Sequence, residues 1–252
     1  MFTHLQPPFY FAHRGASAHA PENTLAAFRL ALEQGAPAIE FDVKLTADRQ
    51  VVIHHDATLN RTTNGAGPLH KHSLSALREL DAGSWFSAQF QGEPIPTLAE
   101  VFELFGRELY FNIELTNYAT PLDGLVDEVA VLVKKHGMTD RVLFSSFYPT
   151  NLVRAGQLLP AVPRGQLILP ERAGWWQRTA ARWLHLHSEH PWKDDITPET
   201  VRSAHARSHR VYVWTVNDPH EMKTLRAQGV DAIFTDDPLL ANQHFISSTL
   251  DF

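Results

Sequence analysis

The feature that most constrains the fold is a regular alternation of short apolar runs and amphipathic stretches along the chain. This alternation is typical of βα units arranged around a parallel sheet. A length of 252 residues with 44% hydrophobic content suits one α/β barrel better than two domains. We therefore predict a single domain over residues 1–252 with a (β/α)8 TIM-type barrel fold. The eight predicted core strands are Phe9–His13, Ala38–Val43, Tyr110–Leu115, Val142–Ser146, Gly165–Leu169, Trp183–His187, Val211–Val216 and Ala232–Thr235.

The first predicted helix has recognisable signals at both ends. Asn23 is a candidate N-cap, because its side chain can accept a hydrogen bond from a free N–H of the first turn. Leu25, Phe28 and Leu32 then form one apolar face, and Gly35 is a candidate stop. We expect this helix to lie between the first and second strands.

One further apolar run, Val51–His55, follows Ala38–Leu45 too closely for a parallel crossover. A hairpin is the natural connection, and we expect its centre near Ala47 and Asp48. In the antiparallel register this places Glu40 roughly opposite His55.

The stretch that follows is rich in Asn, Gly, Thr and Ser, and it is too long for an ordinary loop. It also carries the aromatic residues Trp85, Phe86 and Phe90. We interpret residues at about 57–96 as a small inserted cap after the second-strand hairpin.

Three carboxylates are expected at the carboxyl ends of the early strands, where barrel enzymes carry their active sites. Glu40 and Asp42 are two residues apart, so both side chains point to one face of a strand. With Glu114 beside them, mutual repulsion requires a cation, and oxygen ligands favour Mg²⁺ or Ca²⁺, with Mn²⁺ as a further option. The alternative for any one of the three is an acid on the outer surface.

His13, His55 and Arg14 also fall at strand ends. Imidazole titrates near neutral pH, so the two histidines are candidates for the acid and the base of a hydrolysis, although either could be a surface or structural residue. His54 faces the opposite side of its strand, and we expect it to be structural. The guanidinium of Arg14 suits phosphate oxygens, and its alternative is a salt bridge at the barrel rim.

Composition excludes several function classes. The 22 basic and 28 acidic residues give a net charge of −6, which argues against a nucleic-acid surface. No apolar run approaches the ~20 residues of a membrane span, and no signal peptide is apparent, so we expect a cytoplasmic protein without stable membrane insertion. Without cysteine, any metal must use oxygen or imidazole ligands. Oligomeric state cannot be read from the sequence.

An ordered series of segments resembles the glycerophosphodiester phosphodiesterases, in particular the cytosolic bacterial branch of these PLC-like phosphodiesterase barrels. The segments span nearly the whole chain, and R-T-T-N-G (61–65) and D-A-G-S-W (81–85) strengthen the resemblance. The main segments are H-R-G (13–15), P-E-N-T (21–24), E-F-D (40–42), H-D (55–56), N-I-E (112–114), S-S-F (145–147), W-T-V-N (214–217) and T-D-D-P (235–238).

The resemblance implies a metal-dependent phosphoric diester hydrolase of lipid and glycerol metabolism. Its implied substrates are glycerophosphodiesters such as glycerophosphocholine and glycerophosphoethanolamine, cut to sn-glycerol 3-phosphate and an alcohol. It also implies a barrel with an insertion over its mouth and one divalent ion bound by Glu40, Asp42 and Glu114. His13 and His55 are the implied acid and base, in an order that the sequence does not assign.

The resemblance also names residues for substrate binding. Phe147 and Trp214 are expected to line the pocket, with ordinary aromatic packing as the alternative. At position 116 the family usually has a lysine, as N-I-E-I-K, whereas this chain has the neutral hydroxyl of Thr116. Either Arg14 or Lys44, the nearest candidates, supplies the missing charge beside the phosphate, or the enzyme tolerates weaker charge stabilisation. The alternative for Lys44 is an exposed lysine at the barrel rim.

Two other functions remain open at this point. One is a related barrel phosphodiesterase that acts on intact lipids, such as a phospholipase D-like enzyme. The other is a ligand-binding barrel without turnover, although all the expected acid–base and metal positions are filled. The sequence also leaves open whether water attacks the phosphodiester directly or a cyclic phosphate forms first.

Overall fold

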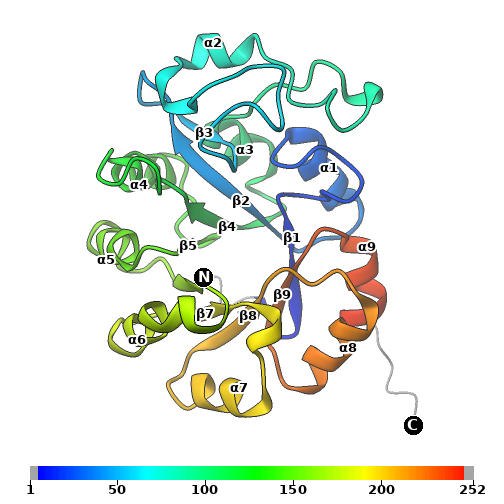
Figure 1. The fold of residues 1–252 in the computed structure, drawn as a ribbon, viewed down its shortest axis with the longest axis vertical. Helices are drawn as coiled ribbons and strands as arrows, with labels where there is room; N and C mark the ends of the chain where they lie inside the picture. Colours follow the sequence, from blue (N-terminus) through cyan, green and yellow to red (C-terminus); the bar gives the residue numbers. More distant parts are fainter. Residues whose placement is uncertain (1–4, 247–252) are drawn as a thin grey trace.

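The computed structural model describes residues 5–246, which form a closed β-barrel surrounded by helices (Figure 1). Strands pair in the order β1-β9-β8-β7-β6-β5-β4-β2, and β1 also pairs with β2, so eight parallel strands close the barrel. The predicted (β/α)8 fold is therefore confirmed. The strands are β1 (Phe9–His13), β2 (Ala38–Leu45), β3 (Val51–Ile53), β4 (Tyr110–Leu115), β5 (Val142–Ser146), β6 (Arg164–Ile168), β7 (Ser188–Pro191), β8 (Arg210–Val213) and β9 (Ala232–Thr235).

Helices follow the parallel strands and cover the outside of the barrel. The α-helices of the described residues are α1 (Leu25–Glu33), α2 (Leu74–Arg78), α3 (Leu98–Phe105), α4 (Leu125–Lys135), α5 (Pro149–Leu158), α6 (Trp175–Trp183), α7 (Pro198–His205), α8 (Pro219–Ala227) and α9 (Pro238–Ala241). Single turns η2 (Leu69–Lys71), η3 (Ala88–Phe90), η4 (Glu171–Gly174) and η5 (Lys193–Asp195) and the π-helical turn η6 (Asn242–Ile246) complete the set.

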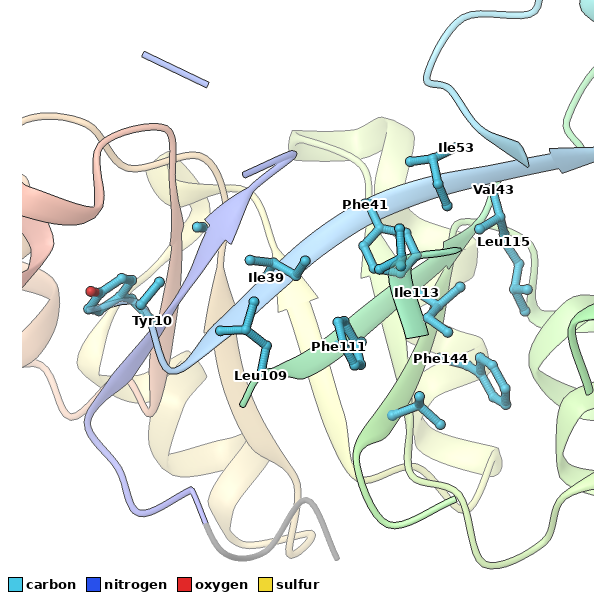
Figure 2. Close-up of a cluster of buried hydrophobic side chains, with 14 of the residues drawn as sticks. Tyr10, Ile39, Phe41, Val43, Ile53, Leu109, Phe111, Ile113, Leu115 and Phe144 are labelled. Carbon is cyan, nitrogen blue, oxygen red and sulfur yellow. The ribbon is translucent and has the colours of Figure 1, made fainter. Parts of the chain in front are cut away.

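Two apolar layers hold the barrel together. The larger lies between the strands and the helices, and Figure 2 shows part of it around Ile39, Phe41 and Phe111. The smaller fills the barrel interior and includes Phe11 and Phe234, whose rings stack with centroids 4.7 Å apart. Because successive strand residues point to opposite faces, both layers follow from the apolar character of the strands.

The start of α1 differs by one residue from the prediction. Thr24 is the N-cap, and its side chain accepts the N–H of Ala27 at 3.2 Å. Asn23 instead has a left-handed backbone with φ of 59° and donates its amide N–H to Asp42 at 3.0 Å. The side chain expected to cap the helix therefore contacts a site carboxylate.

The hairpin of β2 and β3 is present, but the predicted register is wrong by one residue. Val43 pairs with Ile53, and the N–H of His54 donates to the carbonyl of Asp42 at 3.0 Å. Glu40 is therefore not opposite His55. The cause is a three-residue turn that ends at Arg49, whose φ is 60°, so the hairpin is centred on a residue rather than between two.

The segment between β3 and α3 contains η2, α2 and η3 and lies at the top of Figure 1. It has a small apolar cluster of its own, in which Leu59, Leu69 and Leu77 are fully or almost fully buried. These features agree with an inserted cap at about 57–96, although its limits stay an interpretation.

One strand prediction is wrong. Residues Trp183–His187 are not a strand, because α6 continues to Trp183 and β7 begins only at Ser188. The real strand is polar: inside, the hydroxyl of Ser188 and Nε2 of His190 are hydrogen-bonded at 2.8 Å. This hydrogen bond satisfies polar groups of β7 that would otherwise be costly to bury in the barrel. Strand β8 is also shorter than predicted and ends before Trp214.

Candidate active site

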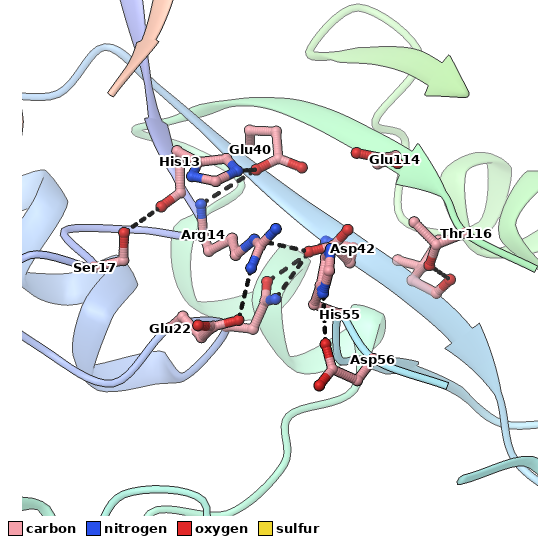
Figure 3. Close-up of polar contacts among 12 residues, drawn as sticks. His13, Arg14, Ser17, Glu22, Glu40, Asp42, His55, Asp56, Glu114 and Thr116 are labelled. Atoms are coloured by element: carbon pink, nitrogen blue, oxygen red, sulfur yellow. Dashed lines mark hydrogen bonds and ion pairs between the residues drawn. The ribbon is translucent and has the colours of Figure 1, made fainter. Parts of the chain in front are cut away.

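Glu40, Asp42 and Glu114 lie together at the carboxyl end of the barrel strands. Glu40 and Asp42 come from β2, and Asp42 is in register with Glu114 on β4 (Figure 3). Each residue offers a carboxylate oxygen within 4.8 Å of the other two. Glu40 and Asp42 are only 3% and 1% exposed. Strand alternation and parallel pairing are sufficient to produce this cluster.

The cluster is electrostatically strained. Burial, followed by the charges of Asp42 and Glu114, raises the pKa of Glu40 well above its ordinary value. Burial and then Asp42 raise the pKa of Glu114 to about 8. Burial opposes ionisation of Asp42 as well, but Arg14 and other positive groups hold its pKa below the ordinary value. Like charges this close cannot all ionise near neutral pH without a cation.

Two oxygens of the cluster have no hydrogen-bond partner among the described residues. They are Oε1 of Glu40 and Oδ1 of Asp42, and both atoms are buried. A buried polar atom without a partner is costly, so such atoms favour binding of an ion or a water molecule. Three neighbouring carboxylates, two of which keep a free buried oxygen, form a donor set that fits a hard divalent cation.

His13 stands at the end of β1 and is held by Asp236. Its Nδ1 lies 2.6 Å from Oδ1 of Asp236 and its Nε2 lies 3.9 Å from Oε2 of Glu40. Burial opposes the charge of Asp236, but hydrogen bonds from His13, Asn217 and Ser17 hold its pKa at about 2. Since this carboxylate can only accept, Nδ1 of His13 donates and Nε2 faces the carboxylate cluster.

His55 follows β3 and is held in a similar way. Its Nδ1 lies 2.7 Å from Oδ1 of Asp56. Hydrogen bonds from Arg61 hold the pKa of Asp56 well below its usual range. Arg61 also donates to Glu22 at 2.7 and 2.8 Å, and Glu22 in turn accepts from Arg14 at 2.8 Å. Acidic and basic side chains therefore alternate from Asp56, beside His55, through Arg61 and Glu22 to Arg14, beside His13.

Arg14 is fixed between acidic groups. Its backbone has a φ of 56°, and its N–H donates to the carbonyl of Glu40 at 2.9 Å. Nη1 bonds Glu22, and Nε lies 3.4 Å from Oδ2 of Asp42. The salt bridges considered from the sequence are thus present, and contact with phosphate stays a prediction.

One cavity of about 260 Å³ brings most of the predicted site residues together. A second cavity, of about 410 Å³, shares His13 and Arg14 with it and is more polar. The first is lined by His13, Arg14, Glu40, His55, Asn112, Glu114, Tyr118, Phe147, Leu167, Trp214 and Phe234. Phe147 and Trp214 meet edge to face, with ring centroids 5.6 Å apart.

Thr116 does not appear in the lining of that cavity. Its hydroxyl donates to the carbonyl of Val43 at 2.8 Å and accepts from Nζ of Lys44 at 3.1 Å. Lys44 also donates to the carbonyl of Thr116 at 2.8 Å. Both residues line a separate crevice of about 20 Å³ between the cap and the loop after β4.

Sequence reasoning missed Tyr118, Glu22 and Asp236. The hydroxyl of Tyr118 donates to Oε1 of Glu114 at 2.8 Å and accepts the N–H of Phe147 at 3.0 Å. Glu22 and Asp236 stand inside the P-E-N-T and T-D-D-P segments, so a signal for them existed. For Tyr118, in a loop after β4, no local pattern indicated a role.

The likeness to known proteins covers most of the chain. Residues 13–240 match the glycerophosphoryl diester phosphodiesterase family. A glycerophosphodiester phosphodiesterase of Caldanaerobacter subterraneus subsp. tengcongensis is 38% identical, over 90% of this chain and 93% of that protein. A glycerophosphodiester phosphodiesterase of Bacillus subtilis is 31% identical, over 90% of this chain and 83% of that protein.

A comparison with solved structures points to the same family. A phosphodiesterase of Oleispira antarctica, in complex with the product sn-glycerol-3-phosphate, superposes on this chain with a TM-score of 0.86 at 36% identity. The superposition covers 96% of this chain and 98% of the Oleispira chain.

Within residues 5–246, the helices are too short or too polar to cross a membrane. On the match over residues 13–240 and these relatives, the chain belongs to the glycerophosphoryl diester phosphodiesterase family, whose members are phosphoric diester hydrolases.

Proposed function

We propose that this protein hydrolyses glycerophosphodiesters, such as glycerophosphocholine and glycerophosphoethanolamine, to sn-glycerol 3-phosphate and an alcohol. One observation carries the proposal: Glu40 and Glu114, two members of a cluster of three carboxylates, line the same cavity as two histidines, each of which is held by a carboxylate. Family membership and the product bound to the Oleispira relative support the substrate class. We further propose that the protein acts in the cytoplasm.

Glu40, Asp42 and Glu114 would hold one divalent ion, Mg²⁺, Ca²⁺ or Mn²⁺. When bound, such an ion draws negative charge from the oxygens of the phosphodiester. The free buried oxygens of Glu40 and Asp42 support this assignment, since they have no other partner among residues 5–246. Tyr118 orients Glu114 through its hydroxyl.

His13 and His55 divide the proton transfers. Asp236 holds the ring of His13 through Nδ1, with Nε2 toward Glu40, and Asp56 holds the ring of His55 through Nδ1. One imidazole takes the proton of the attacking oxygen while the other gives a proton to the departing alcohol. Arg14 directs a guanidinium edge at the phosphate, and Phe147 and Trp214 contact the glycerol or alcohol portion.

The test compares two forms of substrate with purified, metal-supplemented protein. We expect release of sn-glycerol 3-phosphate from dissolved glycerophosphocholine. We expect no release of choline from phosphatidylcholine vesicles. Glu114→Gln is the control for contaminating activity. Turnover of vesicles alone would favour the lipid-directed alternative, and substrate binding without turnover would favour a ligand-binding barrel. A cyclic phosphate trapped in a single turnover would show that the glycerol hydroxyl attacks first.

A further inference from the structure

Lys44 is a half-buried cation on the same strand as two of the site carboxylates. It follows Asp42 by two residues on β2, so its side chain leaves the strand on the same side. Its Nζ donates to the carbonyl of Thr116 at 2.8 Å and to the hydroxyl of Thr116 at 3.1 Å. Both acceptors are neutral. Within residues 5–246, Lys44 forms no ion pair within 4.0 Å.

The other positive groups of the site are already paired. Arg14 bonds Glu22 and also lies 3.4 Å from Asp42 through Nε, and Arg61 bonds both Glu22 and Asp56. The two positive charges are matched in number by the carboxylates of Glu22 and Asp56, so they leave no net positive charge for the three carboxylates of the cluster. The charge of Lys44 is different, because Asp42 and Glu114 are the acidic groups that act on it most strongly, and neither bonds it directly.

The balance of charge in the metal site then depends on Lys44. Three ionised carboxylates around a divalent ion leave one excess negative charge, and the paired set of Arg14 and Arg61 does not remove it. A phosphodiester carries one negative charge of its own. In a buried site with low dielectric, two such charges repel strongly unless a cation offsets the first.

We propose that Lys44 supplies the charge that lets the site accept an anionic phosphodiester, at the expense of metal affinity. The inference rests on the proposed function, since it takes the metal and the phosphodiester from there. Lys44 touches neither group directly in this arrangement. It is a charge-compensating residue that Thr116 holds in place, and the same field that attracts the substrate repels the metal ion.

The test uses Lys44→Gln, which removes the charge and keeps a donor for the carbonyl of Thr116. We expect kcat/KM for glycerophosphocholine to fall about tenfold, mainly through KM, because a lost charge–charge attraction weakens substrate binding. Calorimetric titration of the metal-free protein with Mn²⁺ should show affinity that is several-fold tighter. A merely structural role predicts the opposite for the metal, since a loosened β2 would bind it more weakly.

Two further variants complete the design. Lys223→Gln removes the same charge from the exposed surface of α8 and should change neither quantity. The exchange variant Lys44→Thr/Thr116→Lys returns an ammonium from the residue after the neighbouring strand β4 and should recover most of the lost kcat/KM. The inference is overturned if Lys44→Gln changes kcat/KM by less than about twofold or weakens Mn²⁺ binding. If wild-type protein neither binds Mn²⁺ nor hydrolyses the ester, the proposed function itself has failed.

Discussion

The two histidines of the site are both held by a carboxylate whose charge is fixed by other residues. Asp236 is bonded by Ser17 and Asn217 as well as by His13, and Asp56 is bonded by Arg61 as well as by His55. A carboxylate held in this way fixes the tautomer and direction of its imidazole. The free nitrogen of each ring is then available for proton transfer.

At the residue scale, we predict that His13→Ala or His55→Ala lowers kcat by about 10²-fold to 10⁴-fold, the usual worth of positioned proton transfer. Steady-state kinetics with saturating metal is the measurement, and circular dichroism checks the fold. His185→Ala, an exposed histidine away from the cavity, is the control. A near wild-type rate for either site variant would remove that residue from the acid–base pair.

Much of the residue-scale arrangement could be predicted, because strand alternation is a local rule. Glu40 and Asp42 share a face for that reason alone, and parallel pairing brings Glu114 beside them. Tyr118 could not be found in the same way. Its contact with Glu114 depends on the path of a loop, which no short pattern specifies.

At the start of α1, one residue stabilises the helix and the residue before it contacts the active site. Thr24 satisfies an N–H of the first turn, while Asn23 turns away to bond Asp42. Sequence preference alone does not separate Thr from Asn at an N-cap, because both are favoured there. The left-handed backbone of Asn23 and the position of Asp42 decide the outcome.

At the element scale, we predict that Thr24→Ala destabilises the fold by about 1 kcal/mol, the usual cost of a lost N-cap. Urea unfolding of the metal-free protein measures it. Asn23→Ala is the matched variant, and it should alter metal affinity more than helix stability because it releases Asp42. If Thr24→Ala and Asn23→Ala lowered stability equally and neither changed metal affinity, the separate roles of Thr24 and Asn23 would be contradicted.

The strand order could be predicted, but β7 could not be placed. The segment before it alternates Leu and His and looks like a strand, whereas the true strand carries Ser188, Glu189 and His190. Glu189 is acceptable there because Arg207 and His209 bond it at 2.8 and 2.9 Å. These partners come from the segment that follows α7, so only the folded chain identifies the strand.

For the whole molecule, the carboxylate cluster couples metal binding to stability. Glu114 has a pKa of about 8 in the folded, metal-free chain, against about 4.3 for an unfolded glutamate. Between these values the folded state binds more protons than the unfolded state. Stability therefore falls as the pH rises through this interval.

We predict that the melting temperature of chelated protein decreases from pH 5 to pH 8, and that added Mg²⁺ raises it most at pH 8. Calorimetric melting at a series of pH values, with and without Mg²⁺, measures both effects. Glu114→Gln, which cannot ionise, should show less of the pH dependence. A melting temperature of chelated protein that rises over this range would contradict the proposed electrostatics.

The central claim is that turnover of a glycerophosphodiester depends on one divalent ion held by Glu40, Asp42 and Glu114. The most direct measurement is release of sn-glycerol 3-phosphate from glycerophosphocholine by chelated protein that elemental analysis shows to be metal-free. We predict that this protein is inactive and that Mg²⁺, Ca²⁺ or Mn²⁺ restores activity with one ion bound per chain. Full turnover by the metal-free protein would contradict the account.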